Sequence, residues 1–253
     1  MSSTAIVPFS LTSPFTDPLK LHERMFKFDD RTIKIQQAWK ADGRGGTVLG
    51  FGASVYNGSI LLAYWLASKQ GKSLLANSNV VEVGAGLGLC SLVAALSSPR
   101  NIVCTDGDEG SVALAKDNAE RNGFGGCVKC CRLCWGDAAD IERVRGECLG
   151  GGADVLLAAD VVAAPYALSI PALIDTIEAL LLPASNPSKT PTLLLAYQRR
   201  ESDEASSEAS FFTVMGSRGW KCSLIPPREL HSDFREMSED RLRPLRLYVF
   251  TKQ

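Results

Sequence analysis

The glycine-rich stretch at residues 84–88 carries the clearest chemistry of this 253-residue chain, because it directly follows a short, strongly apolar run. Glycine turns through positive φ and lets the backbone approach a ligand closely, so the pattern predicts a buried strand, a cofactor-binding loop and a helix. A ligand-free strand-to-helix turn could use the same glycines. The residues expected at this loop are Glu82, Gly84, Ala85, Gly86 and Gly88.

The spacing of these glycines distinguishes between cofactors. A dinucleotide fingerprint would need its third glycine at position 89, where the chain has Leu89, so a pyrophosphate is disfavoured. An acidic residue two positions before the first glycine, Glu82, suits a cofactor that carries an ammonium group and no phosphate. S-adenosylmethionine has these properties. A Rossmann-type dehydrogenase is the alternative enzyme.

Two further signals follow the next two predicted strands. Asp106, about twenty residues past the loop, ends an apolar run and is followed by Gly107, which places its carboxylate where it can accept hydrogen bonds from a ribose. We expect Asp108 to cap the helix that comes next. Trp135 follows the third strand, where its ring could lie against an adenine, although a single tryptophan is also a common core residue.

The elements that must position these residues alternate between β-rich and helical patterns. Such alternation predicts an α/β fold with a doubly wound, mostly parallel seven-stranded sheet. The last two strands are joined by residues 226–244, which show no helical period, so one antiparallel strand is expected. Strands are predicted at 80–83, 101–105, 128–134, 154–159, 192–197, 221–225 and 246–251, and helices at 58–69, 87–97, 109–122, 138–148, 166–182 and 205–218.

We predict two regions, an N-terminal extension at residues 1–45, partly flexible and beginning with a loose leader at 1–18, and a cofactor-binding domain at 46–253. The acidic run at 201–204 is expected to start the fifth crossover helix, where negative charge complements the helix dipole. Together the two regions give one large α/β domain with an appendage.

Charge and cysteine content limit the partners and the compartment. With 27 basic and 28 acidic side chains the chain has no net field to hold nucleic acid or an anionic membrane. Eight cysteines without a secretory signal indicate reduced thiols, and so a location in the cytoplasm or the nucleus. No apolar run is long enough to span a membrane.

The cysteines at 127, 130, 131 and 134 do not predict a metal site. They lie within eight residues on a predicted strand whose alternate side chains face opposite ways, so four ligands could not converge. A hydrolase is also disfavoured, because the chain has no G-x-S-x-G nucleophile motif and both histidines lie far from the cofactor signals.

Taken together, these motifs resemble the seven-β-strand S-adenosylmethionine-dependent methyltransferases, and within them the protein-lysine group called methyltransferase family 16. The resemblance covers about residues 45–251. It departs from the family pattern at Cys134, Ala163 and Ala164, where the family has an acid, a tyrosine and an acid. The matching segments are Gly50, Val55-Tyr56 and Leu62-Ala63, then 82–88, Asp106, Asn118, Asn122, 133–136, 160–165 and 197–200.

The resemblance implies methyl transfer to a lysine side chain of a protein partner, by a chain expected to be monomeric. A lysine amine must be neutral and aligned with the methyl group, so a nearby oxygen is needed to orient it. Asp160, at the end of the fourth strand, is the expected orienting group and Tyr197 a second catalytic residue. Tyr56 and Ala159 complete the expected cofactor-binding set. A non-catalytic module that keeps the fold and binds a partner is the alternative, because of Ala163 and Ala164.

Overall fold

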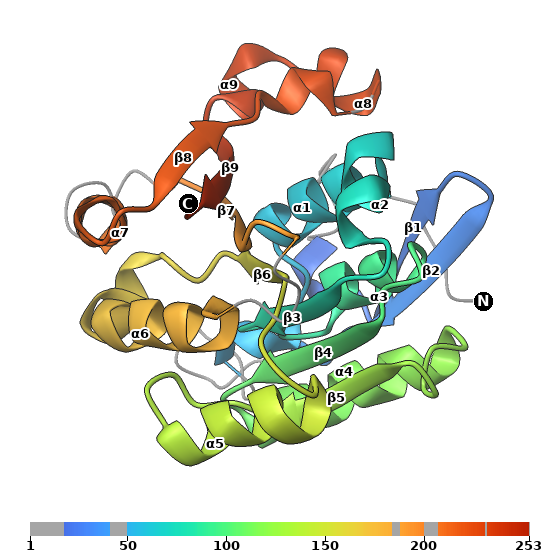
Figure 1. Cartoon of the computed structure of the whole chain (residues 1–253). Coiled ribbons are helices and arrows are strands. Elements are labelled where there is room, and N and C mark those ends of the chain that lie inside the picture. The colour runs from blue at the N-terminus through green and yellow to red at the C-terminus, as the bar shows by residue number, and fades with distance from the viewer. Residues whose placement is uncertain (1–17, 41–49, 184–187, 200–206, 231, 253) are drawn as a thin grey trace.

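A seven-stranded sheet runs through the centre of the molecule (Figure 1). The computed structural model describes residues 18–40, 50–183, 188–199, 207–230 and 232–252. The strand order β5-β4-β3-β6-β7-β9-β8 confirms the doubly wound, mostly parallel sheet, and β9 is antiparallel to both of its neighbours, as expected. The strands are β3 (Asn79–Val83), β4 (Asn101–Asp106), β5 (Val128–Arg132), β6 (Val155–Ala159), β7 (Thr192–Gln198), β8 (Lys221–Leu224) and β9 (Leu245–Thr251).

The strand order reverses at β3, which pairs with β4 on one side and with β6 on the other. In an open α/β sheet such a reversal leaves a crevice outside the carboxyl ends of the strands, because the connections leave on opposite faces. The motif residues at the ends of β3, β4 and β6 are therefore brought to one edge.

Helices cover both faces of the sheet and enclose two hydrophobic layers. Alternate strand residues face the two layers: Val80 lies in the first and Val81 in the second, and both are fully buried. The first layer is covered by α1 (Asn57–Ala67), α2 (Lys69–Leu75), α3 (Leu89–Ala95) and α4 (Glu109–Arg121), and the second by α5 (Ala138–Glu142), the π-helical η3 (Arg143–Cys148), α6 (Ile170–Leu181) and α7 (Ser207–Ser217).

Several predicted elements are subdivided. The helix expected at 58–69 ends at Ala67, because Ser68 adopts an extended conformation and its side chain caps α2 by accepting from Gly71 N. The single helix predicted at 166–182 is divided between the 3-10 helix η4 (Ala164–Ser169) and α6. Residues 226–244, predicted as a loop, contain η6 (Pro227–Glu229), α8 (Ser232–Arg235) and α9 (Glu239–Leu242). The runs at 1–17 and 201–204 lie outside the described residues.

The N-terminal extension contains a β-hairpin that sequence reasoning did not predict. After η1 (Pro18–Lys20), strands β1 (Glu23–Phe28) and β2 (Arg31–Gln36) form a separate antiparallel sheet, away from α6 and α7 in Figure 1. Phe26, Ile33 and Ile35 of this hairpin are almost fully buried in the first hydrophobic layer. The hairpin therefore shares a core with the sheet.

Two asparagines of α4 hold the edge of β2. Asn118 Oδ1 accepts from Gln36 N at 2.8 Å and its Nδ2 donates to Gln36 O at 3.2 Å; Asn122 makes the same pair of bonds with the backbone of Lys34. Asn118 Nδ2 also donates to Leu87 O at 3.2 Å, within the glycine-rich loop. Asn118 thus joins the hairpin to that loop.

We expect Asn118→Asp to lower the free energy of unfolding by about 2 to 3 kcal/mol, because a carboxylate in this buried place would face the carbonyl oxygens of Gln36 and Leu87 without a donor. Urea denaturation measures the change. Asn122→Asp, at a half-buried position, serves as the matched control and should cost less. Equal losses in both variants would contradict the assigned role of Asn118.

Candidate active site

A cavity of about 420 Å³, here called the main cavity, opens at the carboxyl ends of β3, β4 and β6. Every predicted site residue except Glu82 and Tyr197 lines it. Those residues are Tyr56, Gly84, Ala85, Gly86, Asp106, Gly107, Trp135, Ala159 and Asp160.

The glycine-rich loop depends on backbone conformations that favour glycine. Gly84, Gly86 and Gly88 have φ of 62°, 53° and 81°. A Cβ at position 84 would lie 2.8 Å from Val161 Cγ1, so a side chain there would also collide with the end of β6. Ala85 N donates to Thr105 O at 2.9 Å and fixes the loop against β4.

Asp106 holds this loop from the next strand. Its Oδ2 accepts from Gly86 N at 2.9 Å and its Oδ1 from Asp108 N at 3.0 Å. Burial raises the pKa of Asp106, although these backbone hydrogen bonds oppose the change. An ionised carboxylate can accept about four hydrogen bonds, so Asp106 keeps acceptor capacity toward the main cavity. Asp108 caps α4 by accepting from Ser111 N at 2.7 Å, as predicted.

Glu82 lies beneath the loop and not in the main cavity. It is 1% exposed, and its Oε2 accepts from Ser91 N at 2.8 Å and from Ser91 Oγ at 2.5 Å. The N-cap of helix α3 is Gly88, which has no side chain to cap the helix, so Glu82 satisfies the free N–H of Ser91 in the first turn. Glu82 was predicted to lie at the cofactor-binding loop, and in the structure it supports that loop from beneath.

Burial raises the pKa of Glu82 to about 7 from an ordinary 4.5. The folded protein therefore holds this proton more tightly than the unfolded chain, and the stabilisation present below about pH 4.5 is lost as pH rises through about 7. We expect the wild type to lose about 2 to 3 kcal/mol more unfolding free energy than Glu82→Gln between pH 5 and pH 8. Urea denaturation at both values measures this, and identical pH dependence in the two proteins would contradict it.

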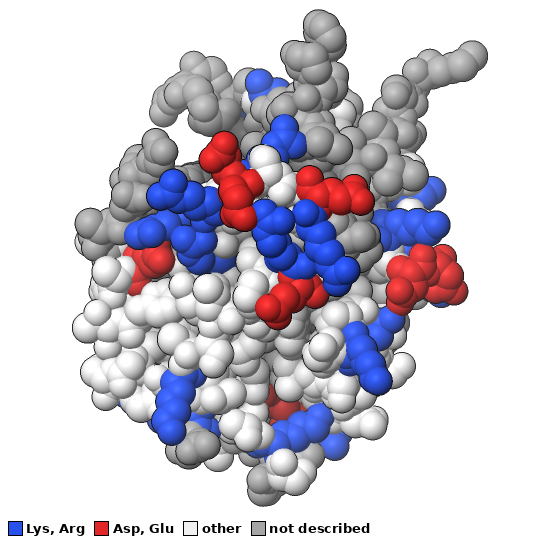
Figure 2. Space-filling model, turned by 90° about the horizontal axis from the view of Figure 1, so that it is seen from above, with Lys and Arg blue, Asp and Glu red and all other residues white. Residues whose placement is uncertain are grey.

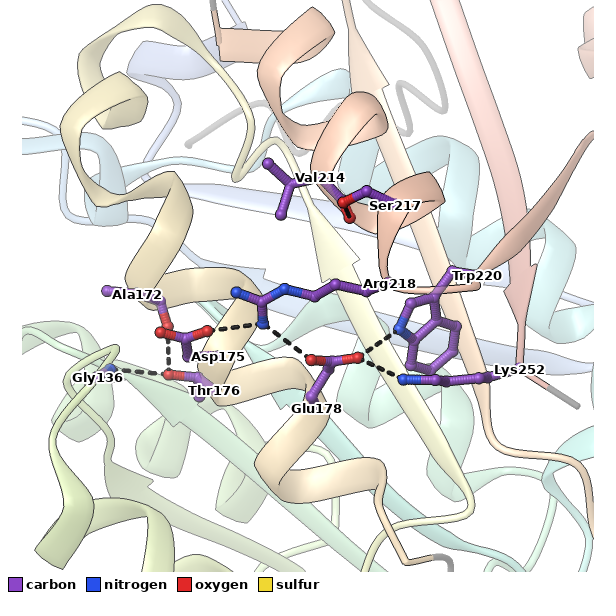
Figure 3. Close-up of polar contacts among 10 residues, drawn as sticks. All are labelled: Gly136, Ala172, Asp175, Thr176, Glu178, Val214, Ser217, Arg218, Trp220 and Lys252. Carbon is purple, nitrogen blue, oxygen red and sulfur yellow. Dashed lines mark hydrogen bonds and ion pairs between the residues drawn. The ribbon is translucent and has the colours of Figure 1, made fainter.

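Trp135 lines the main cavity beside the glycine loop, where a Cβ at position 84 would lie 3.4 Å from its Cζ2. Its ring meets that of Tyr166 edge to face, with centroids 5.6 Å apart. The next residue, Gly136, has φ of 82° and donates its N–H to Thr176 Oγ1 at 2.8 Å, while Thr176 donates to Ala172 O (Figure 3). Helix α6 thus anchors the turn that presents Trp135.

An ionic network holds α6 itself in place (Figure 3). Arg218 Nη1, just after α7, lies 2.7 Å from Asp175 Oδ1 and 2.8 Å from Glu178 Oε2. Trp220 Nε1 and Lys252 Nζ both donate to Glu178 Oε1, at 2.9 and 2.8 Å. The network joins α6 to the residues that flank β8 and β9, so the turn at Trp135 is supported from the far end of the sheet.

We expect Trp135→Phe to weaken cofactor binding about threefold to tenfold with little change in melting temperature, because the smaller ring leaves part of the adenine uncovered. Calorimetry and thermal melting separate the two effects. Trp220→Phe is the matched control: it removes the hydrogen bond to Glu178 within the core and should lower the melting temperature without changing cofactor affinity. The reverse outcome would make Trp135 a packing residue.

Asp160 lies at the end of β6, where it borders the main cavity. Its Oδ2 accepts from Gly58 N at 2.9 Å, in the first turn of α1, and its Oδ1 from Gln198 N at 3.0 Å, at the end of β7. Its φ is 57°, an unfavourable conformation for a residue with a side chain and one often found at functional sites. A Cβ at position 58 would lie 2.4 Å from Asp160 Oδ2, so Gly58 makes this contact possible.

Tyr197 is not brought into the main cavity, contrary to the expectation of a catalytic contact beside the cofactor. It is buried, donates to Glu208 Oε1 at 2.6 Å, and lines a small pocket with Asp160, Ala163 and Arg199. Burial, and then the hydrogen bond to Glu208, raise the pKa of Tyr197. Arg199 Nε lies 3.2 Å from Glu208 Oε2.

Residues 52–56 form a further wall that the N-terminal segment holds in place. Val55 N donates to Gln37 Oε1 at 2.8 Å, and Val55 O accepts from Arg24 Nη1 at 2.9 Å. Ser54 Oγ donates to Leu19 O at 2.6 Å. Gly50 and Tyr56 could mark this wall from the family pattern, but nothing in the sequence indicated Gln37 or Arg24.

Other residues of the cavity wall were missed. Ser111 carries no recognisable signal in the sequence, and Ser59 and Ala172 lie on helix faces that sequence alone does not orient. The residues of this kind are Gly52, Ser54, Ser59, Ser111, Ser169 and Ala172. The four neighbouring cysteines do not converge: Cys130 packs against the first hydrophobic layer and Cys131 against the second.

Comparison with known proteins assigns this arrangement to a family. The sequence profile of the family described as lysine methyltransferase (methyltransferase family 16) matches residues 27–218. This chain belongs to that family.

The chain is similar to two curated relatives in particular. Over 190 residues it is 32% identical to protein N-lysine methyltransferase METTL21A of Danio rerio, which covers 73% of this chain and 76% of the relative. It is 35% identical to protein-lysine methyltransferase METTL21E of Mus musculus over 117 residues, which cover 44% of this chain and 45% of that protein.

Solved structures show the same fold at low identity. The O-methyltransferase from Bacillus cereus in complex with SAH has a TM-score of 0.51 and 13% identity, over 79% of this chain and 83% of that one. Magnesium protoporphyrin IX methyltransferase from Synechocystis PCC 6803 with bound SAH has a TM-score of 0.50 and 15% identity, over 77% and 82%. At such identities the likeness shows the fold alone.

The family confirms the predicted fold, cofactor and reaction. The protein is an S-adenosylmethionine-dependent methyltransferase that acts on lysine in a protein substrate. The dehydrogenase alternative is therefore wrong. Within the part of the chain that the structure describes, no helix has both the length and the apolar character needed to cross a membrane.

Proposed function

We propose that S-adenosylmethionine binds in the main cavity with its adenosine between Asp106 and Trp135 and its reactive end toward Asp160. The observation that carries this proposal is the charge of the wall. Three carboxylates, those of Asp106, Asp108 and Asp160, line the cavity, and its described lining residues include no lysine or arginine. This wall suits a cofactor with an ammonium and a sulfonium group, whereas a pyrophosphate would meet like charge.

Each wall has a defined task in this proposal. The backbone of Gly84, Ala85 and Gly86 approaches the cofactor, and Asp106 accepts from its ribose hydroxyls. Gly107 and Ala159 leave room for it at the ends of β4 and β6. Glu82 acts indirectly, by holding the first turn of α3. When bound, the cofactor supplies a methyl group on a positively charged sulfur.

The acceptor lysine enters beside Asp160. Its amine must arrive neutral and in line with the methyl group, and a hydrogen bond to Asp160 fixes its direction. Asp160 Oδ2 accepts from Gly58 N and Oδ1 from Gln198 N, and these bonds hold the carboxylate at the edge of the main cavity, where the amine arrives. Tyr56 and Ala163 border the cavity as well and shape the approach. Tyr197 is a positioning residue that holds Glu208 in the small pocket behind Asp160.

The partner we propose is a protein that presents a lysine to a monomeric enzyme in the cytoplasm or the nucleus. Nucleic acid is an unsuitable partner because positive and negative side chains intermingle on the face seen in Figure 2, and a broad part of that face carries neither. Exposed charges also pair with each other, as Arg228 does with Glu239 at 2.5 Å. We place the start of the catalytic domain at residue 46, with the hairpin of the extension held against it.

We expect Asp160→Asn to lower methylation at least tenfold while the affinity for S-adenosylmethionine stays within a few-fold, because only the reacting complex uses the hydrogen bond to the amine. Radiolabelled cofactor with a cell lysate reports methylation of lysines in the labelled bands, and calorimetry reports the affinity. Unaltered methylation would rule out the role of Asp160. Loss of cofactor binding would instead place Asp160 in the cofactor site.

Gly58→Ala provides a companion variant that keeps the carboxylate. Its new Cβ would lie within contact distance of Asp160 Oδ2 and displace it, so methylation should fall as in Asp160→Asn. Gly110→Ala, in the first turn of α4 and away from the cavity wall, is the control for adding a methyl group to a helix start.

A further inference from the structure

The hydroxyl of Ser111 has no use in the structure as described so far. Ser111 is 1% exposed, and its Oγ has no hydrogen-bond partner among the described residues. Its backbone N–H is satisfied by Asp108 Oδ2, so the first turn of α4 does not need the side chain. A buried hydroxyl without a partner is unfavourable, and few native proteins retain one without reason.

The surroundings of Ser111 place this hydroxyl at the main cavity. Ser111 lines the cavity together with Gly52, Asp106 and Asp108. A Cβ at position 52 would lie 1.9 Å from Ser111 Oγ, so the 3-10 helix η2 (Gly50–Ala53) passes directly over it. A Cβ at position 86 would lie 3.7 Å from Gly52 Cα, which brings the glycine-rich loop to the same place.

Gly52 has no side chain and so leaves the space that the hydroxyl of Ser111 occupies at the wall of the main cavity. Any larger residue at position 52 would occupy the place of the Ser111 side chain, so the pair consists of one residue without a side chain and one with a small polar one. An alanine at position 111 would fill the space beside Gly52 nearly as well. Packing therefore does not account for the oxygen atom.

We propose that Ser111 is a cofactor-binding residue whose hydroxyl donates a hydrogen bond to a ribose oxygen of S-adenosylmethionine. We assign the ribose as the partner because Ser111 closely follows the Asp106–Asp108 turn in the chain and lines the same cavity as Asp106. Asp106 accepts from the ribose hydroxyls, and Ser111 supplies the complementary donor. The inference rests on the proposed position of the cofactor.

The test compares Ser111→Ala with the wild type by calorimetry, using S-adenosylhomocysteine as the ligand. We expect the dissociation constant to rise about fivefold to tenfold, as for the loss of one buried hydrogen bond. The melting temperature of the ligand-free variant should stay the same or rise, because an unsatisfied buried hydroxyl has been removed. An unchanged dissociation constant would overturn the proposal.

Ser97→Ala is the matched control. Ser97 Oγ is also buried without a partner among the described residues, but it lies after α3 and does not line the main cavity. Its removal should likewise leave the melting temperature unchanged or higher, with no change in affinity. Equal weakening in both variants would show that Ser111 acts through stability and not through the ligand, and would overturn the proposal.

A second ligand tests the ribose assignment. Methylthioadenosine has the adenine and the ribose but lacks the amino acid end of the cofactor, so Ser111→Ala should weaken its binding by the same factor. Weakened binding of S-adenosylhomocysteine alone would place the contact at the amino acid end and overturn the ribose assignment. Asp106→Ala, measured in parallel, tests the proposed cofactor position itself: if it leaves the affinity unchanged, that position is wrong whatever Ser111 does.

Discussion

The site depends on carboxylates that bind backbone N–H groups where glycines shape the backbone. Asp106 binds the N–H of Gly86 and Asp160 that of Gly58, whereas Glu82 binds the N–H of Ser91 in the first turn of α3, whose N-cap is Gly88. In each case the glycine brings the backbone close enough, or lacks the side chain that would otherwise make the bond. These carboxylates bind backbone N–H groups, and the described lining of the main cavity includes no lysine or arginine, so the wall suits a cationic cofactor.

This arrangement explains which parts of the fold and site were predictable. The glycine loop, Asp106 and Asp160 follow strand ends, and in a parallel sheet strand ends meet at one edge, so residue type and order were sufficient. The direction in which each side chain points from its strand was harder to predict from the sequence. Glu82 lies on β3 and Tyr197 near the end of β7, yet Glu82 points beneath the loop to Ser91 and Tyr197 points toward Glu208.

Long-range pairs account for what sequence reasoning missed. The hairpin was overlooked because its buried face includes Arg24, which disguises the alternation of Phe26 and Phe28, and because its partner is the pair of asparagines on α4. The relation of Ser111 to Gly52 joins residues of different elements and is visible only once η2 lies over α4. Neither pair has a local pattern of its own.

The hairpin has a consequence for how the site is assembled. Gln37 and Arg24 bind the backbone of Val55, and Asn118 connects β2 to Leu87, so the N-terminal segment contacts both the wall at residues 52–56 and the glycine loop. The family match begins at residue 27, within β1, which agrees with this connection. Two sets of contacts therefore hold the cavity wall in place: those of carboxylates at the strand ends, and those of the N-terminal segment with the backbone. Because η2 covers Ser111, the geometry of the main cavity is coupled to the packing of the hairpin.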